Sequence, residues 1–134
     1  MKIRNGFVTN SSSSSYLVVY KVYDSMELQK WCKEELGNRG LKRYNDYLLD
    51  HSTFKEKIIE YYEDYQGSNI GDDEDFNEEI DDEIINALKE PDTKFIMGWA
   101  VAYTTEGDSD SNEILFAHEL PNNKYEVIYQ GDDN

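Results

Sequence analysis

The residues best suited to chemistry in this chain are carboxylates, and they are concentrated in one short segment. Nine Asp and Glu side chains lie within the twelve residues from Asp72 to Glu83. Such a cluster could be a solvated helix face, a substitute for the phosphates of a nucleic acid in a basic groove, or an attractor of metal ions and other charged partners. Solubility alone does not require this clustering, so the phosphate-substitute hypothesis predicts partner binding by Asp72, Asp73, Glu74, Asp75, Glu78, Glu79, Asp82 and Glu83.

Charge is also divided unevenly along the whole chain. Residues 1–59 carry ten Lys and Arg against seven Asp and Glu, whereas residues 60–134 carry three Lys against twenty-two Asp and Glu. The formal net charge of −16 argues against nucleic acid as a direct ligand, because contacts with phosphates need clustered Lys and Arg. We therefore expect a basic protein as the partner.

Side chains suited to catalysis are few. The two histidines, His51 and His118, lie in no recognisable triad context. Cys32 falls on the predicted inner side of a helix, where a packed thiol is more usual than a nucleophile. The chain has no glycine-rich phosphate loop. We therefore expect no enzymatic activity, with an uncharacterised enzyme as a lesser alternative.

One segment has calcium-type spacing. In an EF-hand-like frame, positions 1, 3, 5 and 12 would be Asp108, Asp110, Asn112 and Glu119. Position 6 is Glu113, where such loops need glycine for a sharp turn, and the flanks favour strands over helices. We therefore expect no metal and no other cofactor.

Strands that could position these groups are indicated by β-branched and aromatic residues. Tyr16–Tyr23 is apolar on both faces, which predicts a central strand. Further strands are predicted at Phe95–Thr104, Glu113–Leu120 and Tyr125–Gln130. In the first of these, the alternation of Phe95, Met97, Trp99 and Val101 supplies one apolar face for the sheet.

Helical spacing occupies the region between the first two predicted strands. Asp24 and Thr53 are the expected N-caps of two helices that end at Gly37 and Gly67, and a short helix is expected at Leu41–Leu49 between them. The acidic segment is expected to form one helix, Asp73–Lys89, with a buried stripe of Phe76, Ile80, Ile84 and Leu88. The predicted fold class is α+β: an antiparallel sheet of three to four strands, with three to four helices inserted between the first and later strands and packed on one face.

The N-terminal segment Gly6–Tyr16 reads GFVTNSSSSSY. It resembles the opening of small bacteriophage and bacterial proteins that begin with a basic residue or two, here Lys2 and Arg4, and continue through an FVSNSSSSSF-like run into a strand. The resemblance covers about the first twenty residues and implies a phage or mobile-element context. The serine run itself is interpreted as a flexible polar linker, with a phosphorylation tract, an anion-binding loop or a recognition tag as alternatives.

Together these features predict a single domain over residues 1–134, with a flexible basic, serine-rich arm at 1–15 and a disordered tail at 131–134. The chain lacks an apolar signal or membrane-length segment and has a single cysteine, so we expect a cytoplasmic protein with no membrane partner. The expected function is non-enzymatic: an acidic protein that binds and inhibits a basic nucleic-acid-binding host protein, such as a defence nuclease, as a DNA mimic does. The alternative is a structural or assembly protein of a virion.

Overall fold

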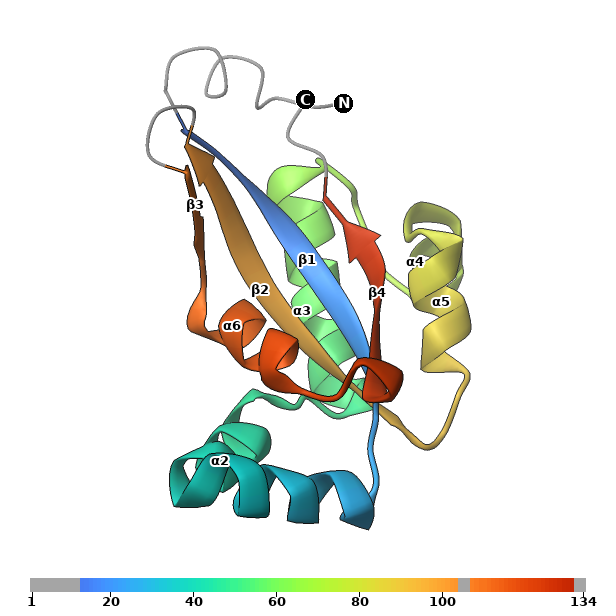
Figure 1. The fold of residues 1–134 in the computed structure, drawn as a ribbon. Helices are drawn as coiled ribbons and strands as arrows, with labels where there is room; N and C mark the ends of the chain where they lie inside the picture. The colour runs from blue at the N-terminus through green and yellow to red at the C-terminus, as the bar shows by residue number, and fades with distance from the viewer. Residues whose placement is uncertain (1–12, 104–106, 132–134) are drawn as a thin grey trace.

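The fold is built on a four-stranded antiparallel sheet with helices on both of its faces (Figure 1). The computed structural model describes residues 13–103 and 107–131. In chain order its elements are β1 (Ser13–Tyr23), α2 (Met26–Tyr47), α3 (His51–Tyr65), α4 (Asp73–Glu79), α5 (Asp82–Leu88), β2 (Thr93–Tyr103), β3 (Gly107–Asp110), α6 (Asn112–Glu119), the 3-10 helix η1 (Asn122–Lys124) and β4 (Tyr125–Gln130). The mixed α+β class is therefore as predicted.

The strand β1 lies inside the sheet, whose order is β3-β2-β1-β4. Its side chains explain this position, because they are apolar on both faces. Leu17 and Val19 face one side, and Val18, Tyr20 and Val22 face the other. All five are buried.

The two strands that the sequence predicted to lie in one sheet are direct neighbours in it. β1 pairs with β2 along its whole length and with β4 at its other edge. The prediction that Tyr16–Tyr23 and Phe95–Thr104 share one sheet is thus confirmed for the described residues. Phe95, Met97 and Trp99 lie on the same face, as their alternation indicated.

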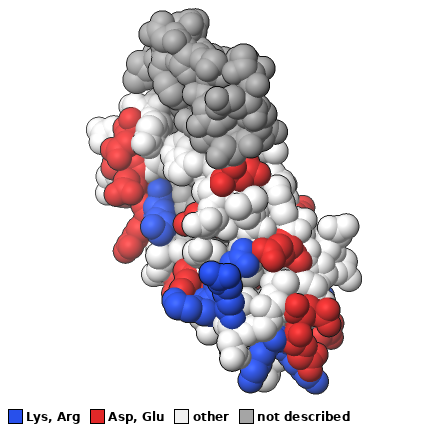
Figure 2. Space-filling model, turned by 60° about the vertical axis from the view of Figure 1, so that its left-hand side comes forward, with Lys and Arg blue, Asp and Glu red and all other residues white. Residues whose placement is uncertain are grey.

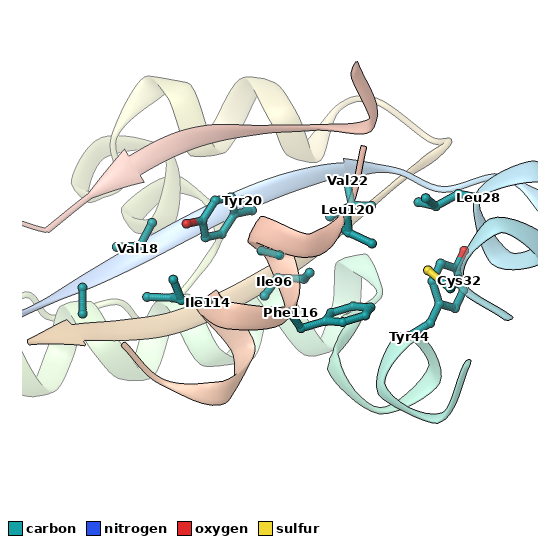
Figure 3. Close-up of a cluster of buried hydrophobic side chains, with 12 residues drawn as sticks. Val18, Tyr20, Val22, Leu28, Cys32, Tyr44, Ile96, Ile114, Phe116 and Leu120 are labelled. Atoms are coloured by element: carbon teal, nitrogen blue, oxygen red, sulfur yellow. The ribbon is translucent and has the colours of Figure 1, made fainter. Parts of the chain in front are cut away.

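The helices cover both faces of the sheet. α3, α4 and α5 pack on the face that carries Leu17 and Val19. α6 lies between β3 and β4 in the chain and packs, with part of α2, on the opposite face around Phe116 (Figure 3). The prediction of three to four helices inserted between the first and later strands and packed on one face is met only in part. The helices α2 to α5 lie between β1 and β2, but α6 lies between β3 and β4, and the helices cover both faces. A strand that is apolar on both sides needs cover on both sides.

The segment predicted as the strand Glu113–Leu120 forms the helix α6. The hydroxyl of Ser111 caps this helix by accepting a hydrogen bond from the amide of Ile114, at 3.4 Å. Ile114 and Ala117, three residues apart, are buried, whereas His118 is exposed. A strand would have turned Ile114 and Ala117 to opposite faces, so their shared burial follows a helix.

Gly98 allows α6 to begin directly against the sheet. A Cβ atom at this position would lie 2.5 Å from the hydroxyl oxygen of Ser111 and 2.7 Å from Cγ1 of Ile114. The amide of Ser111 also donates to the carbonyl of Trp99, at 2.8 Å. The absence of a side chain on β2 therefore sets how closely α6 approaches.

Both predicted helix caps are displaced from their expected positions. The N-cap of α2 is Ser25, not Asp24, and its hydroxyl accepts from the amide of Leu28 at 3.0 Å. The N-cap of α3 is Asp50, whose carboxylate accepts from the amide of Thr53, the expected cap, at 2.8 Å. In each case the cap lies three residues before the amide that it satisfies.

The predicted stop at Gly37 is a kink inside α2. Gly37 has φ 77° and ψ −168°, a backbone conformation that favours glycine. Helical hydrogen bonding resumes directly after it, so the predicted helix Leu41–Leu49 is the second half of α2 and ends at Tyr47.

The two predicted flexible ends are partly ordered. Ser13, Ser14 and Ser15 of the serine-rich arm belong to β1 and pair with β2. Gly131, predicted to begin the tail, is buried, and its amide donates to the carbonyl of Leu17 at 2.6 Å. The rest of the arm and of the tail lies outside the described residues. Within the described ranges, no helix is long and apolar enough to span a bilayer.

Candidate functional site: the acidic surface of α4 and α5

The acidic segment forms two short helices, α4 and α5, beside β4 (Figure 1). α4 ends at Glu79 and α5 begins at Asp82. Ile80 and Asp81, which lie between them, have extended backbone angles. The prediction of one continuous helix over Asp73–Lys89 is therefore wrong.

Repulsion between carboxylates gives a physical reason for this break. In a continuous helix Glu78 would stand one turn from Asp82, and Glu79 one turn from Glu83, and each such pair of like charges costs roughly 0.2–0.5 kcal/mol. The break removes this one-turn helical spacing and adds a second helix N-terminus, where the helix dipole favours negative charge. Asp82 and Glu83 occupy the first turn of α5.

Tyr62 of α3 fixes the junction between the two helices. Its hydroxyl donates to the carboxylate of Asp81 at 2.6 Å and accepts from the amide of Asp81 at 3.3 Å. Tyr62 is only 4% exposed, and burial, followed by the hydrogen bond to Asp81, raises the pKa of its phenol. Asp81 is the one carboxylate of the segment that was not assigned to partner binding, and its contacts are structural.

An apolar stripe anchors α4 and α5 to the rest of the molecule. Phe76, Ile80 and Ile84 are buried, as predicted, and Leu88 is half-buried. They pack in the cluster that includes α3 and one face of the sheet. The i+4 spacing therefore predicts the burial of Phe76, Ile80 and Ile84 correctly across the break in the helix, whereas Leu88 at the end of the stripe is only half-buried.

The eight predicted partner-binding residues divide by what they contact. Asp72 caps α4 by accepting from the amide of Asp75 at 2.9 Å, and Asp75 accepts from the amide of Gly71 at 3.0 Å. Asp73 pairs with Lys55 at 3.0 Å. Five others are exposed and have no ion pair or hydrogen bond through their carboxylates to any described residue; we call them the acidic surface: Glu74, Glu78, Glu79, Asp82 and Glu83.

Positive charge lies elsewhere in the chain. No Lys or Arg occurs between Lys57 and Lys89, whereas α2 carries five. Figure 2 shows Lys and Arg beside Asp and Glu on the side of the molecule that is turned forward there. Lys55 lies against α4, where it pairs with Asp73, but the five residues of the acidic surface carry one sign of charge, which attracts a positively charged partner.

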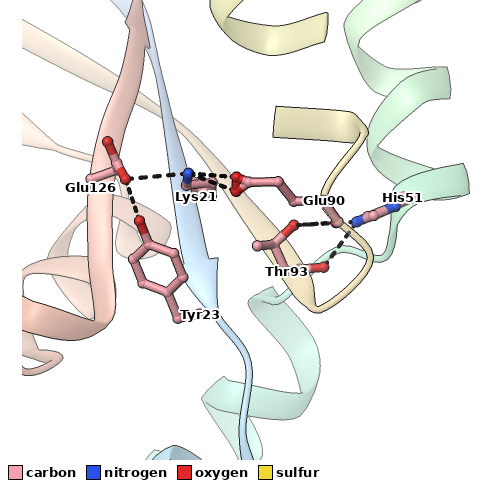
Figure 4. Close-up of polar contacts among 6 residues, drawn as sticks. All are labelled: Lys21, Tyr23, His51, Glu90, Thr93 and Glu126. Atoms are coloured by element: carbon pink, nitrogen blue, oxygen red, sulfur yellow. Dashed lines mark hydrogen bonds and ion pairs between the residues drawn. The ribbon is translucent and has the colours of Figure 1, made fainter. Parts of the chain in front are cut away.

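A second charged cluster joins β1, β4 and the segment after α5 (Figure 4). The ammonium of Lys21 lies 2.9 and 3.0 Å from the two carboxylate oxygens of Glu90 and 3.3 Å from Glu126. Burial alone would lower the pKa of Lys21, but its hydrogen bonds to the two carboxylates raise it overall. Tyr23 donates to Glu126 and lowers the pKa of that carboxyl. Since these groups satisfy one another, the cluster is structural.

The residues considered for catalysis contact other partners. Cys32 is fully buried, as predicted for a packed thiol, and burial raises its pKa to about 11. His51 hydrogen-bonds to the carbonyl of Thr93 at 3.0 Å (Figure 4). Nε2 of His118 lies 2.6 Å from the hydroxyl of Tyr20. His51 also lies 3.3 Å from the hydroxyl of Thr93, but that hydroxyl is buried and donates to the carbonyl of Glu90 at 3.0 Å, so the contact is structural.

The calcium-type spacing spans two elements of regular structure. Asp108 and Asp110 belong to β3, whereas Asn112 and Glu119 begin and end α6. The carboxylate of Glu119 pairs with Arg43 at 2.5 Å. One flank is thus a helix and not the expected strand. Within the described part of the chain, no group of three or more His, Cys, Asp or Glu is arranged to hold a metal ion.

These contacts define an acidic α+β protein that presents five carboxylates of one sign on two short, well-anchored helices. Comparison of the chain with protein-family models, with curated proteins and with solved structures finds no match. The resemblance of the N-terminal segment stays a prediction.

Proposed function

We propose that this protein binds and inhibits a basic nucleic-acid-binding protein of a host cell, in whose cytoplasm it acts. The acidic surface would occupy the groove in which the partner normally holds nucleic acid phosphates. The protein acts by binding and not by catalysis, in the phage or mobile-element setting that its N-terminal segment implies. The observation that carries this proposal is the exposure of five carboxylates that have no cationic partner among the described residues.

The way in which the acidic surface is anchored supports binding. The buried side chains of Phe76, Ile80 and Ile84 fix both helices to the core, and Tyr62 fixes the junction between them. A partner would therefore meet carboxylates on a backbone that is already ordered. Because little backbone entropy is then lost on binding, more of the Coulombic attraction contributes to affinity.

Two triple variants that lose the same number of charges, one inside and one outside the acidic surface, separate partner binding from simple solvation. Glu74→Gln, Glu78→Gln and Glu79→Gln together remove three charges from the acidic surface. The control, Glu35→Gln with Glu56→Gln and Asp92→Asn, removes three charges from exposed sites outside it. Each protein is immobilised and exposed to a bacterial lysate at low and at high salt, and captured proteins are identified by mass spectrometry.

The parent and the control should capture basic nucleic-acid-binding proteins that added salt releases, because the attraction is largely Coulombic. The acidic-surface variant should bind the captured protein at least roughly tenfold more weakly, which is about 1.4 kcal/mol. Its fold should be unchanged, with stability within about 0.5 kcal/mol of the parent or above it. If the acidic-surface variant binds as tightly as the parent, the carboxylates are only a solvated face. Capture of capsid or tail components would support the virion-assembly alternative instead.

A further inference from the structure

A second surface lies between α3 and β2, apart from α4 and α5. It is a cavity of about 410 Å³, and none of its lining residues belongs to α4 or α5. Tyr61 and Tyr65 of α3, together with Met97 and Trp99 of β2, line it. We call this cavity the aromatic groove. Its volume lies near the lower end of the range of roughly 300–1,000 Å³ that ligand sites occupy, so it suits a side chain and its neighbouring backbone better than a large cofactor.

Three aromatic rings form an angled wall in the aromatic groove. The ring centroids of Tyr65 and Trp99 are 5.4 Å apart, with an interplanar angle of 60°. Those of Tyr61 and Trp99 are 6.0 Å apart, and those of Tyr61 and Tyr65 are 5.5 Å apart. Tyr65 is 44% exposed, so its ring is accessible to a ligand. The faces of such rings attract a cation, Trp most strongly.

The charged side chains that line the aromatic groove are mainly acidic. Glu60, Asp64 and Glu113 have no ion pair with any described residue, while Asp46 already pairs with Lys42 at 2.6 Å. Lys57 is the single basic residue of the lining. This balance favours a cationic ligand and disfavours a carboxylate or a phosphate.

The edge of β2 offers backbone groups in the same place. Phe95 exchanges two hydrogen bonds with Leu49, at 2.7 and 3.0 Å, and Trp99 accepts from Ser111, so both residues turn their backbone groups toward this edge. Because these directions alternate along a strand, Met97 must turn its N–H and C=O the same way. No described residue bonds to Met97 from that side. A free donor and acceptor on a strand edge can pair with an extended peptide.

We propose that the aromatic groove binds an extended peptide segment of a partner protein through one arginine side chain. The flat guanidinium stacks against Tyr65 and Trp99 and donates to the unpaired carboxylates, while the peptide backbone pairs with Met97. Arginine fits better than lysine, because its planar group both stacks on rings and bonds to carboxylates through a fork of donors. This inference does not depend on the acidic surface, because the two sites share no residue.

A peptide with a single arginine tests the proposal directly. The probe is a blocked heptapeptide of glycine and serine with a central arginine; the comparators carry citrulline, which has the same shape without the charge, or lysine. Binding is followed by the fluorescence of Trp99 in a Trp31→Phe background and by amide chemical shifts. The arginine peptide should bind at least roughly tenfold more tightly than the citrulline peptide and more tightly than the lysine peptide. The amide of Met97 should shift on binding.

Variants in the groove complete the test. Tyr65→Leu, which keeps apolar packing, and the pair Glu60→Gln with Asp64→Asn should each weaken arginine-peptide binding several-fold. Glu56→Gln, on the same helix but outside the lining, should leave binding unchanged. The acidic-surface variant should also bind the peptide as the parent does, which separates this proposal from the proposed function. Equal binding of the citrulline peptide, or full binding by Tyr65→Leu, would overturn the proposal. So would free arginine that binds as tightly as the peptide while the Met97 amide does not shift.

Discussion

Removal of one hydroxyl, by Tyr62→Phe, should loosen the junction between α4 and α5. The hydroxyl makes one hydrogen bond to the carboxylate of Asp81 and accepts one from its amide. A hydrogen bond to a charged group contributes roughly 1.5–3 kcal/mol and a neutral one roughly 0.5–1.5 kcal/mol. Since Asp81 is exposed, water replaces part of both contacts. We therefore expect a loss of about 1.5–2.5 kcal/mol in the free energy of unfolding.

Urea unfolding measured by circular dichroism gives this difference, and the midpoint of thermal unfolding should fall by roughly 5–10 °C. Hydrogen exchange should show the largest loss of protection in the amides of α5. Tyr65→Phe is the matched control on the same helix, because its hydroxyl makes no hydrogen bond to a described residue, and it should change stability by less than about 0.5 kcal/mol.

A double-mutant cycle with Asp81→Ala isolates the contact itself. The coupling between the two positions should be at least about 1 kcal/mol. If Tyr62→Phe is no more destabilising than Tyr65→Phe, or if the coupling is near zero, the Tyr62 hydroxyl does not fix the junction.

Three further predictions concern the core. Gly98→Ala should destabilise the protein by about 1–3 kcal/mol, since its methyl group would meet Ser111; an unchanged urea midpoint would contradict this close approach. Burial raises the pKa of Tyr20 to about 12 and also raises that of Tyr62. Because both tyrosines lose their protons more easily when unfolded, their contribution to stability should be constant below about pH 10 and then fall by up to roughly 1.4 kcal/mol per pH unit for each, as urea titrations would show; a stability that stays unchanged above about pH 10 would refute it. The Cys32 thiol should react with a disulfide reagent only as fast as the protein opens, and fast labelling of the native protein would contradict its burial.

The parts of the fold that the sequence predicted well are those in which apolar spacing admits one interpretation. Tyr16–Tyr23 is too rich in β-branched and aromatic residues to be anything but a strand. The apolar spacing around Ile114 and Phe116 fits both the two-residue period of a strand and the 3.6-residue period of a helix. Only the cap at Ser111 distinguishes the helix. The strand β3 is short and polar, so its position depends on the edge of β2 and not on its own residues.

The candidate site could be predicted in its composition but not in its geometry. The exposure of Glu78 and Asp82 follows from the apolar stripe beneath them. Because the i+4 spacing of that stripe continues across the helix break, the sequence gives no sign of the break. The aromatic groove gives no sequence signal, because Tyr65, Trp99 and Glu113 come from three separate elements. Only the packing of α3 against β2 brings such residues together.

The position of β1 has a consequence for how the chain reaches its native state. β1 joins partners that are remote in sequence, since Ser13 pairs with Tyr103 and Val18 pairs with Gln130. Long loops must close, at a cost in chain entropy, before these strand pairs can stabilise the fold, and this slows folding. During synthesis the helices α2 to α5 can form while β1 still has no neighbour, and its two apolar faces then have no complete cover. A nascent chain whose β4 has not yet emerged from the ribosome is therefore the form most prone to aggregation and most in need of a chaperone.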